Sequence, residues 1–87
     1  MIMKKEGRII QVGDVSIGGN IRLQRERMGL KQTEMVARLQ LLGCDISVYS
    51  YNRIEKGSQN PTVSQLLALC QIFSCDINCL FGMKSVL

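Results

Sequence analysis

Three helix-like segments of this chain each stop at a glycine, and these glycines keep the three helices short. The segments end at Gly29, Gly43 and Gly57, and glycine most easily takes the left-handed conformation that terminates a helix. The chain has 87 residues, one proline and 5% aromatic residues. It is long enough for one core, and its composition is a poor match for an all-β sandwich. The sequence therefore predicts a single small all-α domain.

Five helices are predicted, with short connections between them. The expected ranges are 17–28, 32–42, 48–56, 63–73 and a last short helix that ends near 81–82. Ser47 is expected to cap the third helix and Asp76 the last one. Thr62 and Gln65 have the spacing of a capping box at the start of the fourth helix.

The two ends of the chain are assigned to no helix. Residues 1–16 are interpreted as an N-terminal arm, in which only 8–12 has the pattern of a short strand. The helical domain is assigned to 17–81 and a C-terminal tail to 82–87. The arm lacks the apolar run of a signal peptide, and no apolar stretch is long enough to span a bilayer. We expect a cytoplasmic protein that does not enter a membrane.

The charges of the chain are unevenly distributed. Eleven Lys and Arg residues oppose seven Asp and Glu residues, a net charge of +4. Residues 1–57 hold ten of the basic and six of the acidic side chains. This asymmetry predicts a surface that meets an anion, with nucleic acid as the first candidate. Histidine is absent, which excludes catalysis by Ser-His or Cys-His pairs, so we expect no enzyme.

The four cysteines are expected to be reduced thiols. They are Cys44, Cys70, Cys75 and Cys79. The last three could be considered as ligands of a structural zinc. Their spacing is not the paired C-x2-C of such sites, and no histidine can complete the shell. Core packing or surface exposure is therefore expected, with no metal and no cofactor.

The segment 48–56 has two contrasting faces when it is drawn as a helix. One face carries Ser50, Tyr51, Ile54 and Glu55, and the other carries Val48, Tyr49, Asn52, Arg53 and Lys56. The second face has no acidic residue and could contact bases and phosphates, although a merely solvated surface is the alternative. Glu55 on the apolar face needs a cation, and Arg25 on the first helix is the candidate.

Four motifs in this order resemble a known family. They are Ile17-Gly18-Gly19-Asn20-Ile21-Arg22, Arg25-x-x-x-Gly29-Leu30-x-Gln32, the segment from Ser47 to Gly57, and Asn60-Pro61-Thr62. Together they resemble the Cro/phage-repressor type of helix-turn-helix domain, also called the xenobiotic-response-element type, over about 17–81. The resemblance implies a five-helix lambda-repressor-like DNA-binding domain.

The resemblance also implies roles for individual residues. The base-reading residues would be Val48, Tyr49, Asn52 and Arg53. Gln32 would contact a phosphate, and in a DNA complex we expect Lys31 and Lys56 to contact phosphates as well. Ser47 would cap the reading helix, and Arg25 with Glu55 would be the interior ion pair of the family.

The chain departs from the family pattern at three places. About five extra residues around 40–44 indicate a longer-turn variant, which is similar to some small bacterial regulators. Lys31 replaces the usual Thr cap. Val48 and Tyr49 replace polar reading residues, which favours contact with thymine methyl groups and a tyrosine hydroxyl bonded to phosphate.

The resulting prediction is a sequence-specific transcriptional regulator of double-stranded DNA, acting as a repressor and as a homodimer. The dimer is expected to form through the last helix, the end of 63–73 and the tail with Met83, Val86 and Leu87. On the segment 63–73, the expected core residues are Val63, Leu66, Leu67 and Cys70. Leu69, Ile72 and Phe73 widen the apolar surface, either for a subunit interface or for burial by the last helix. The alternative is a protein-interaction module, or an antitoxin with a toxin partner.

Overall fold

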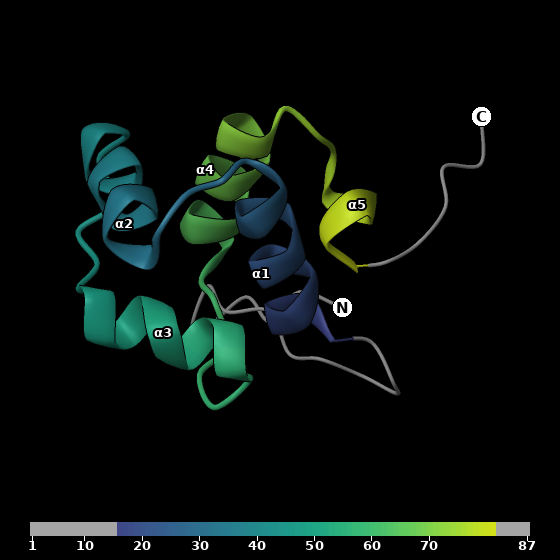
Figure 1. The fold of residues 1–87 in the computed structure, drawn as a ribbon, viewed down its shortest axis with the longest axis horizontal. Helices are drawn as coiled ribbons and strands as arrows, with labels where there is room; N and C mark the ends of the chain where they lie inside the picture. Colours follow the sequence, from purple (N-terminus) through teal and green to yellow (C-terminus); the bar gives the residue numbers. More distant parts are fainter. Residues whose placement is uncertain (1–15, 82–87) are drawn as a thin grey trace.

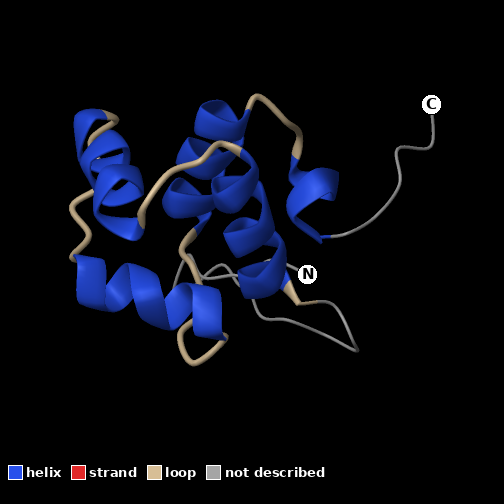
Figure 2. Ribbon diagram, viewed as in Figure 1, coloured by secondary structure: helices blue, strands red, loops and turns tan. Residues whose placement is uncertain are grey.

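The computed structural model describes residues 16–81, which form five helices joined by loops (Figures 1 and 2). The helices are α1 (Ile17–Arg27), α2 (Gln32–Leu41), α3 (Val48–Lys56), α4 (Val63–Phe73) and α5 (Ile77–Phe81). The predicted all-α fold and the number of helices are confirmed for this part of the chain. The predicted arm, apart from Ser16, and the predicted tail lie outside the described residues.

The helix ends follow the glycines. Gly29, Gly43 and Gly57 have φ values of 69°, 88° and 83°, in the left-handed region. The first two helices are each one residue shorter than predicted, because Met28 and Leu42 are the C-cap residues. Both C-cap residues are exposed.

The predicted caps of α3, α4 and α5 are present. Ser47 Oγ accepts a hydrogen bond from the Ser50 backbone N–H at 3.0 Å, and Asp76 Oδ1 accepts one from Cys79 at 3.2 Å. A reciprocal pair of bonds joins Thr62 and Gln65. The Lys31 side chain does not cap α2, as the sequence predicts. The Lys31 backbone N–H donates to Glu34 Oε1 at 2.8 Å, and this bond partly compensates for the missing side-chain cap.

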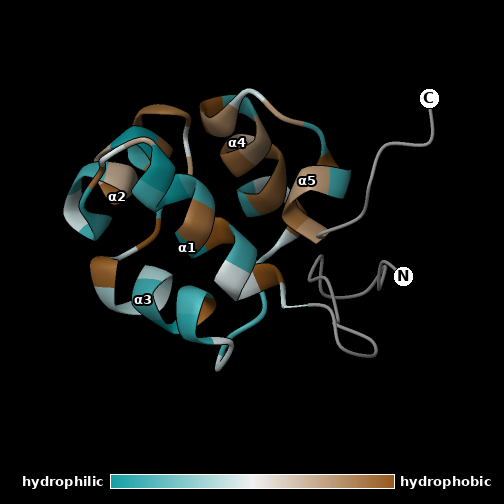
Figure 3. Cartoon of the chain, turned by 45° about the vertical axis from the view of Figure 1, so that its right-hand side comes forward, coloured by the Kyte–Doolittle hydropathy of each residue, from teal (hydrophilic) through white to brown (hydrophobic). Residues whose placement is uncertain are grey.

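The core lies where α1 meets α3, α4 and α5, with α2 packed on α3 and α4. Its buried apolar residues are Ile17, Ile21, Met35, Val36, Leu39, Ile46, Tyr51, Ile54, Leu66, Ala68, Leu69 and Leu80. Figure 3 shows that α5 and much of α4 are hydrophobic, whereas α3 is mostly hydrophilic along the side in view. In this view the hydrophobic residues thus gather on α4 and α5 and the hydrophilic residues on α3.

The interior face of α4 differs from the prediction. Leu67 is 61% exposed, whereas Leu69 is buried. Leu66 and Leu69 are three residues apart and share a helix face, and Leu67 is turned about 100° away from Leu66. Ile72 and Phe73 pack against the core but are only partly buried, so part of the apolar surface at the end of α4 stays exposed.

α1 and α3 approach each other closely at Gly18. A Cβ atom on Gly18 would collide with the carbonyl oxygen of Ile54 and would lie 2.7 Å from the carbonyl oxygen of Glu55. Only glycine therefore permits this crossing. Arg25 lies two turns further along the same side of α1, which places it beside α3.

No helix within residues 16–81 has the length and apolar character needed to cross a membrane.

Candidate nucleic-acid interface

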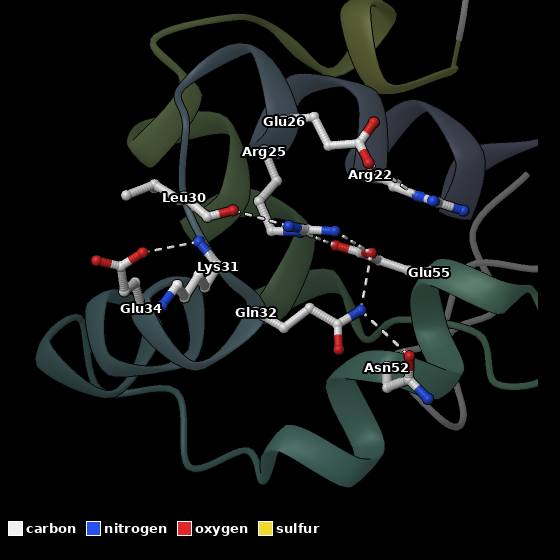
Figure 4. A network of polar contacts seen from close by, with 9 residues as sticks. All are labelled: Arg22, Arg25, Glu26, Leu30, Lys31, Gln32, Glu34, Asn52 and Glu55. Atoms are coloured by element: carbon white, nitrogen blue, oxygen red, sulfur yellow. Dashed lines mark hydrogen bonds and ion pairs between the residues drawn. The ribbon is translucent and has the colours of Figure 1, made fainter.

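The candidate site is built around an ion pair between α1 and α3 (Figure 4). Arg25 Nε donates to Glu55 Oε2 at 2.7 Å, and Arg25 Nη2 donates to Glu55 Oε1 at 3.0 Å. The two side chains are only 11% and 2% exposed. Arg25 Nη1 also donates to the carbonyl oxygen of Leu30 at 2.7 Å. The sequence analysis expected Arg25 and Glu55 to pair, and the structure brings them together.

The ion pair keeps Glu55 charged. Burial alone would raise the pKa of the Glu55 carboxyl, but the groups of Arg25, Tyr51 and Gln32 that face it outweigh burial and hold the pKa below its ordinary value. The hydrogen bond with Glu55 raises the pKa of Arg25. A buried carboxylate that stays ionised can only accept hydrogen bonds.

Gln32, the first residue of α2, joins this pair to the outer face of α3. Its Nε2 donates to Glu55 Oε1 at 3.0 Å and to Asn52 Oδ1 at 3.1 Å. The predicted phosphate contact from this amide would have to replace one of these bonds. The Gln32 backbone N–H remains suitable, because the first N–H groups of a helix have no partner within it. The pattern of the sequence gave no sign of this bridge, which joins the start of α2 to α3.

The four predicted base-reading residues lie on α3 and are at least partly exposed. They are Val48, Tyr49, Asn52 and Arg53. The Arg53 guanidinium lies over the Tyr49 ring, 5.7 Å from its centre, and Tyr49 is 70% exposed. Among residues 16–81, no carboxylate forms an ion pair with Arg53. The Arg53 guanidinium is therefore positioned by a cation–π contact with Tyr49 and keeps its full positive charge.

A polar hollow of about 280 Å³ lies between α1, the start of α2 and α3. It is lined by Arg22, Arg25, Gln32, Asn52, Glu55 and Lys56. Arg25 is paired with Glu55 and Arg22 with Glu26, so Lys56 is the cation of this lining that forms no ion pair with a described residue. A phosphate group would suit this cation and the exposed Arg22 beside it. Arg22 was not predicted as a site residue. Its spacing of three residues before Arg25 on the same helix is the signal that could have identified it.

The two predicted phosphate-binding lysines lie at the edges of this region. Lys31 immediately precedes α2, and Lys56 is the last residue of α3. Both are exposed. Neither forms an ion pair within the part of the chain that the structure describes, so both ammonium groups are available to an anion.

Tyr51 lies beneath the ion pair on the inner side of α3, as the helical periodicity predicts. The residue is buried, and its hydroxyl has no well-formed hydrogen bond to any described residue. It lies close enough to Glu55 to help lower the pKa of that carboxyl. Burial raises the pKa of Tyr51 far above its ordinary value.

The cysteines lie away from this surface and are all partly buried. Cys79 Sγ accepts a hydrogen bond from Gln24 Nε2 at 3.2 Å, and Cys44 Sγ lies 3.8 Å from the carbonyl oxygen of Ser64. Burial raises the pKa of Cys70, and raises that of Cys75 to about 12. Within residues 16–81, no three acidic or cysteine side chains are arranged to hold a metal ion.

A family model described as a helix-turn-helix domain matches residues 16–77, and this agrees with the family that the sequence motifs resemble. Searches of curated proteins and of solved structures found no match.

Proposed function

The chain belongs to the helix-turn-helix domain family, and we propose that it is a transcriptional regulator that recognises a specific sequence of double-stranded DNA through α3. One observation carries the proposal. The outward face of α3 holds Arg53 and Lys56, and no described carboxylate pairs with either of them. A face of this kind suits a major groove lined by phosphates and by the acceptor atoms of bases. No catalytic step is needed for this function.

In the proposed complex, α3 enters the major groove and α2 crosses the DNA backbone. Lys31, Lys56 and the backbone N–H of Gln32 contact phosphates. Arg22 adds a cation to the polar hollow where a phosphate would lie. These contacts position the domain and carry no sequence information.

Within the groove, the residues of α3 divide the reading of bases. Arg53 donates two parallel hydrogen bonds to O6 and N7 of a guanine. Val48 contacts a thymine methyl group, and the Tyr49 hydroxyl is within reach of a neighbouring phosphate. Ser47 supports this helix from its N-terminal end, since its side chain caps α3.

We further propose that the protein acts as a homodimeric repressor, with residues 1–16 as an arm, 17–81 as the DNA-binding domain and 82–87 as a tail. α3 has nine residues, so one copy contacts few base pairs. Two copies on half-sites about one helical turn apart would provide the specificity of an operator. The proposed interface is α5, the end of α4 and the tail.

A second function, protein interaction by an antitoxin-like module, is favoured by exposed apolar side chains. Leu41 is 86% exposed and Leu67 is 61% exposed. A hollow of about 360 Å³ between the end of α2 and α4 includes Leu42 and Leu67 in its lining. A toxin bound there would leave the reading face of α3 free.

Selection from a random duplex library with the full chain tests the first function. We expect one enriched sequence. Arg53→Ala should weaken binding to that sequence about 5- to 150-fold and relax the preference at one base pair. Lys31→Ala or Lys56→Ala should weaken binding to every duplex equally and reduce its salt dependence.

Failure to enrich any sequence, or an equal loss for specific and random DNA in Arg53→Ala, would contradict this function and favour the protein-interaction module. Light scattering tests the dimer separately. A monomer at high micromolar concentration without DNA would exclude a preformed dimer.

A further inference from the structure

We infer that Asn52 and Arg53 present only hydrogen-bond donors to DNA, so that the recognised half-site places guanine beneath both residues and the paired asparagine–adenine contact is not available at the Asn52 position. The inference rests on the proposed function and specifies the bases that α3 selects. It depends on the orientation of one side-chain amide, which the buried ion pair determines.

The first step is the charge on Glu55. Its carboxylate receives two hydrogen bonds from Arg25, at 2.7 and 3.0 Å, and its side chain is 2% exposed. An ionised carboxylate has no proton to donate. Any further partner of Glu55 must therefore supply an N–H or O–H group.

The second step is the orientation of Gln32. Its amide meets Glu55 Oε1 at 3.0 Å, so the NH2 group, and not the carbonyl oxygen, must face the carboxylate. The alternative orientation would place two acceptors in contact. The same nitrogen has a second hydrogen, which it donates to Asn52 Oδ1. The distance from Gln32 Nε2 to Asn52 Oδ1 is 3.1 Å.

The third step is the orientation of Asn52. Because the Gln32 NH2 group is a donor, Asn52 must turn its oxygen toward Gln32. Figure 4 shows the Asn52 amide nitrogen pointing away from the network. The usual contact of asparagine with adenine uses its oxygen and nitrogen side by side, on N6 and N7. In this structure the oxygen is turned inward, and only the NH2 group is available to a base.

The fourth step joins Asn52 to Arg53, the next residue of α3. A guanidinium is a hydrogen-bond donor only. The Arg53 guanidinium lies over the Tyr49 ring, and this contact leaves its N–H groups free to donate to a base. In the major groove, guanine presents two acceptors, O6 and N7, whereas thymine presents only one, O4, beside its methyl group. Adenine presents an acceptor beside a donor, and cytosine presents a donor. Adjacent donors on Asn52 and Arg53 therefore match guanine.

The experiment combines base analogues with selection, and uses the full chain. The base pair read by Asn52 is the one at which Asn52→Ala loses preference in selection. We expect the wild type to enrich guanine there. Replacing that guanine by 7-deazaguanine removes the N7 acceptor and should weaken binding about 5- to 150-fold. Replacing it by inosine retains O6 and N7 and should change binding less than about twofold.

Gln32→Leu tests the cause of the preference, because it frees the Asn52 amide to rotate. We expect this variant to accept adenine as well as guanine at the Asn52 position and to keep its guanine preference at the Arg53 position. The analogue measurements use the wild type, so they decide the inference even where Gln32→Leu folds poorly.

Three results would overturn the inference while the proposed function stands. The first is enrichment of any base other than guanine at the Asn52 position by the wild type. The second is an unchanged preference in folded Gln32→Leu. The third is a motif that Asn52→Ala leaves unaltered. A wild type that enriches no motif would overturn the proposed function itself, so the two failures are distinguishable.

Discussion

Arg25 of α1 binds both carboxylate oxygens of Glu55 in α3, at 2.7 and 3.0 Å. The same guanidinium holds the carbonyl oxygen of Leu30, in the connection that leads to α2. Gln32 then joins α2 to Glu55 and to Asn52. One buried ion pair thus positions three helices and also orients a side chain on the outer face of α3.

Arg25→Ala should destabilise the domain by about 3–5 kcal/mol, because it leaves the Glu55 carboxylate buried and unpaired. Urea unfolding measures the loss. Arg22→Ala is the matched control, since the Arg22–Glu26 pair lies on the surface, with side chains 63% and 51% exposed. We expect the control to cost no more than about 1 kcal/mol. Equal losses in the two variants would show that the Arg25–Glu55 pair is not buried in solution.

Glu55 should make the stability of the fold depend on pH in the acidic range. Its folded pKa is held below the ordinary value of 4.5 by its hydrogen-bonded partners, so the unfolded chain takes up the proton first as the pH falls. The contribution of Glu55 to the free energy of unfolding is complete well above pH 4.5 and is lost as the pH falls through the pKa of the folded state. Thermal unfolding between pH 7 and pH 2 should show a steeper loss in the wild type than in Glu55→Gln. Parallel curves would contradict this prediction.

Tyr51 has the opposite dependence on pH. Burial raises its pKa, so the unfolded chain loses the proton first as the pH rises past about 10. The contribution of neutral Tyr51 to the free energy of unfolding is complete below that pH and is lost as the pH rises toward the pKa of the folded state. Tyr51→Phe should change stability by less than about 1 kcal/mol at pH 7, because the hydroxyl has no well-formed partner. Urea unfolding under reducing conditions at pH 8 and 10.5 should show a smaller alkaline loss in the variant, and an equal loss would contradict the assignment.

Gly18→Ala should destabilise the fold by about 1–3 kcal/mol, because the new methyl group would collide with the carbonyl oxygens of Ile54 and Glu55. Gly19→Ala is the control on the next residue. Its Cβ would meet only the movable Ser16 side chain, 2.8 Å from Oγ, and alanine favours a helix over glycine by about 1 kcal/mol. Chemical denaturation of both variants checks the prediction. A stable Gly18→Ala protein would show that α1 and α3 can separate.

The helix ends and the ion pair could be predicted because they depend on local rules. Left-handed glycines end α1, α2 and α3, and short polar residues cap the helices at fixed spacing. Arg25 and Glu55 followed from periodicity, because a carboxylate on an apolar face requires a cation.

The remaining features depend on packing between distant segments. Leu67 and Leu69 are both apolar, and only the position of α4 against its neighbours decides which of them is buried. The bridge from Gln32 to Asn52 joins the start of α2 to α3, and it depends on how the longer turn places these two helices, which no local pattern specifies. The polar hollow beside Arg22 likewise requires three helices to be placed before it can be recognised.

The stacking of Arg53 on Tyr49 predicts that the two residues act together in DNA binding. Tyr49→Ala should weaken binding about two- to fivefold, because the guanidinium loses the ring that holds it. Tyr49→Phe keeps the ring and should retain most of the affinity. In Arg53→Ala the ring has no partner, so adding Tyr49→Ala should cause a smaller loss than it does in the wild type, namely the part that the Tyr49 hydroxyl contributes at a phosphate. Titration of the four variants against the selected duplex measures this coupling. Independent, additive losses would show that Tyr49 contacts DNA without positioning Arg53.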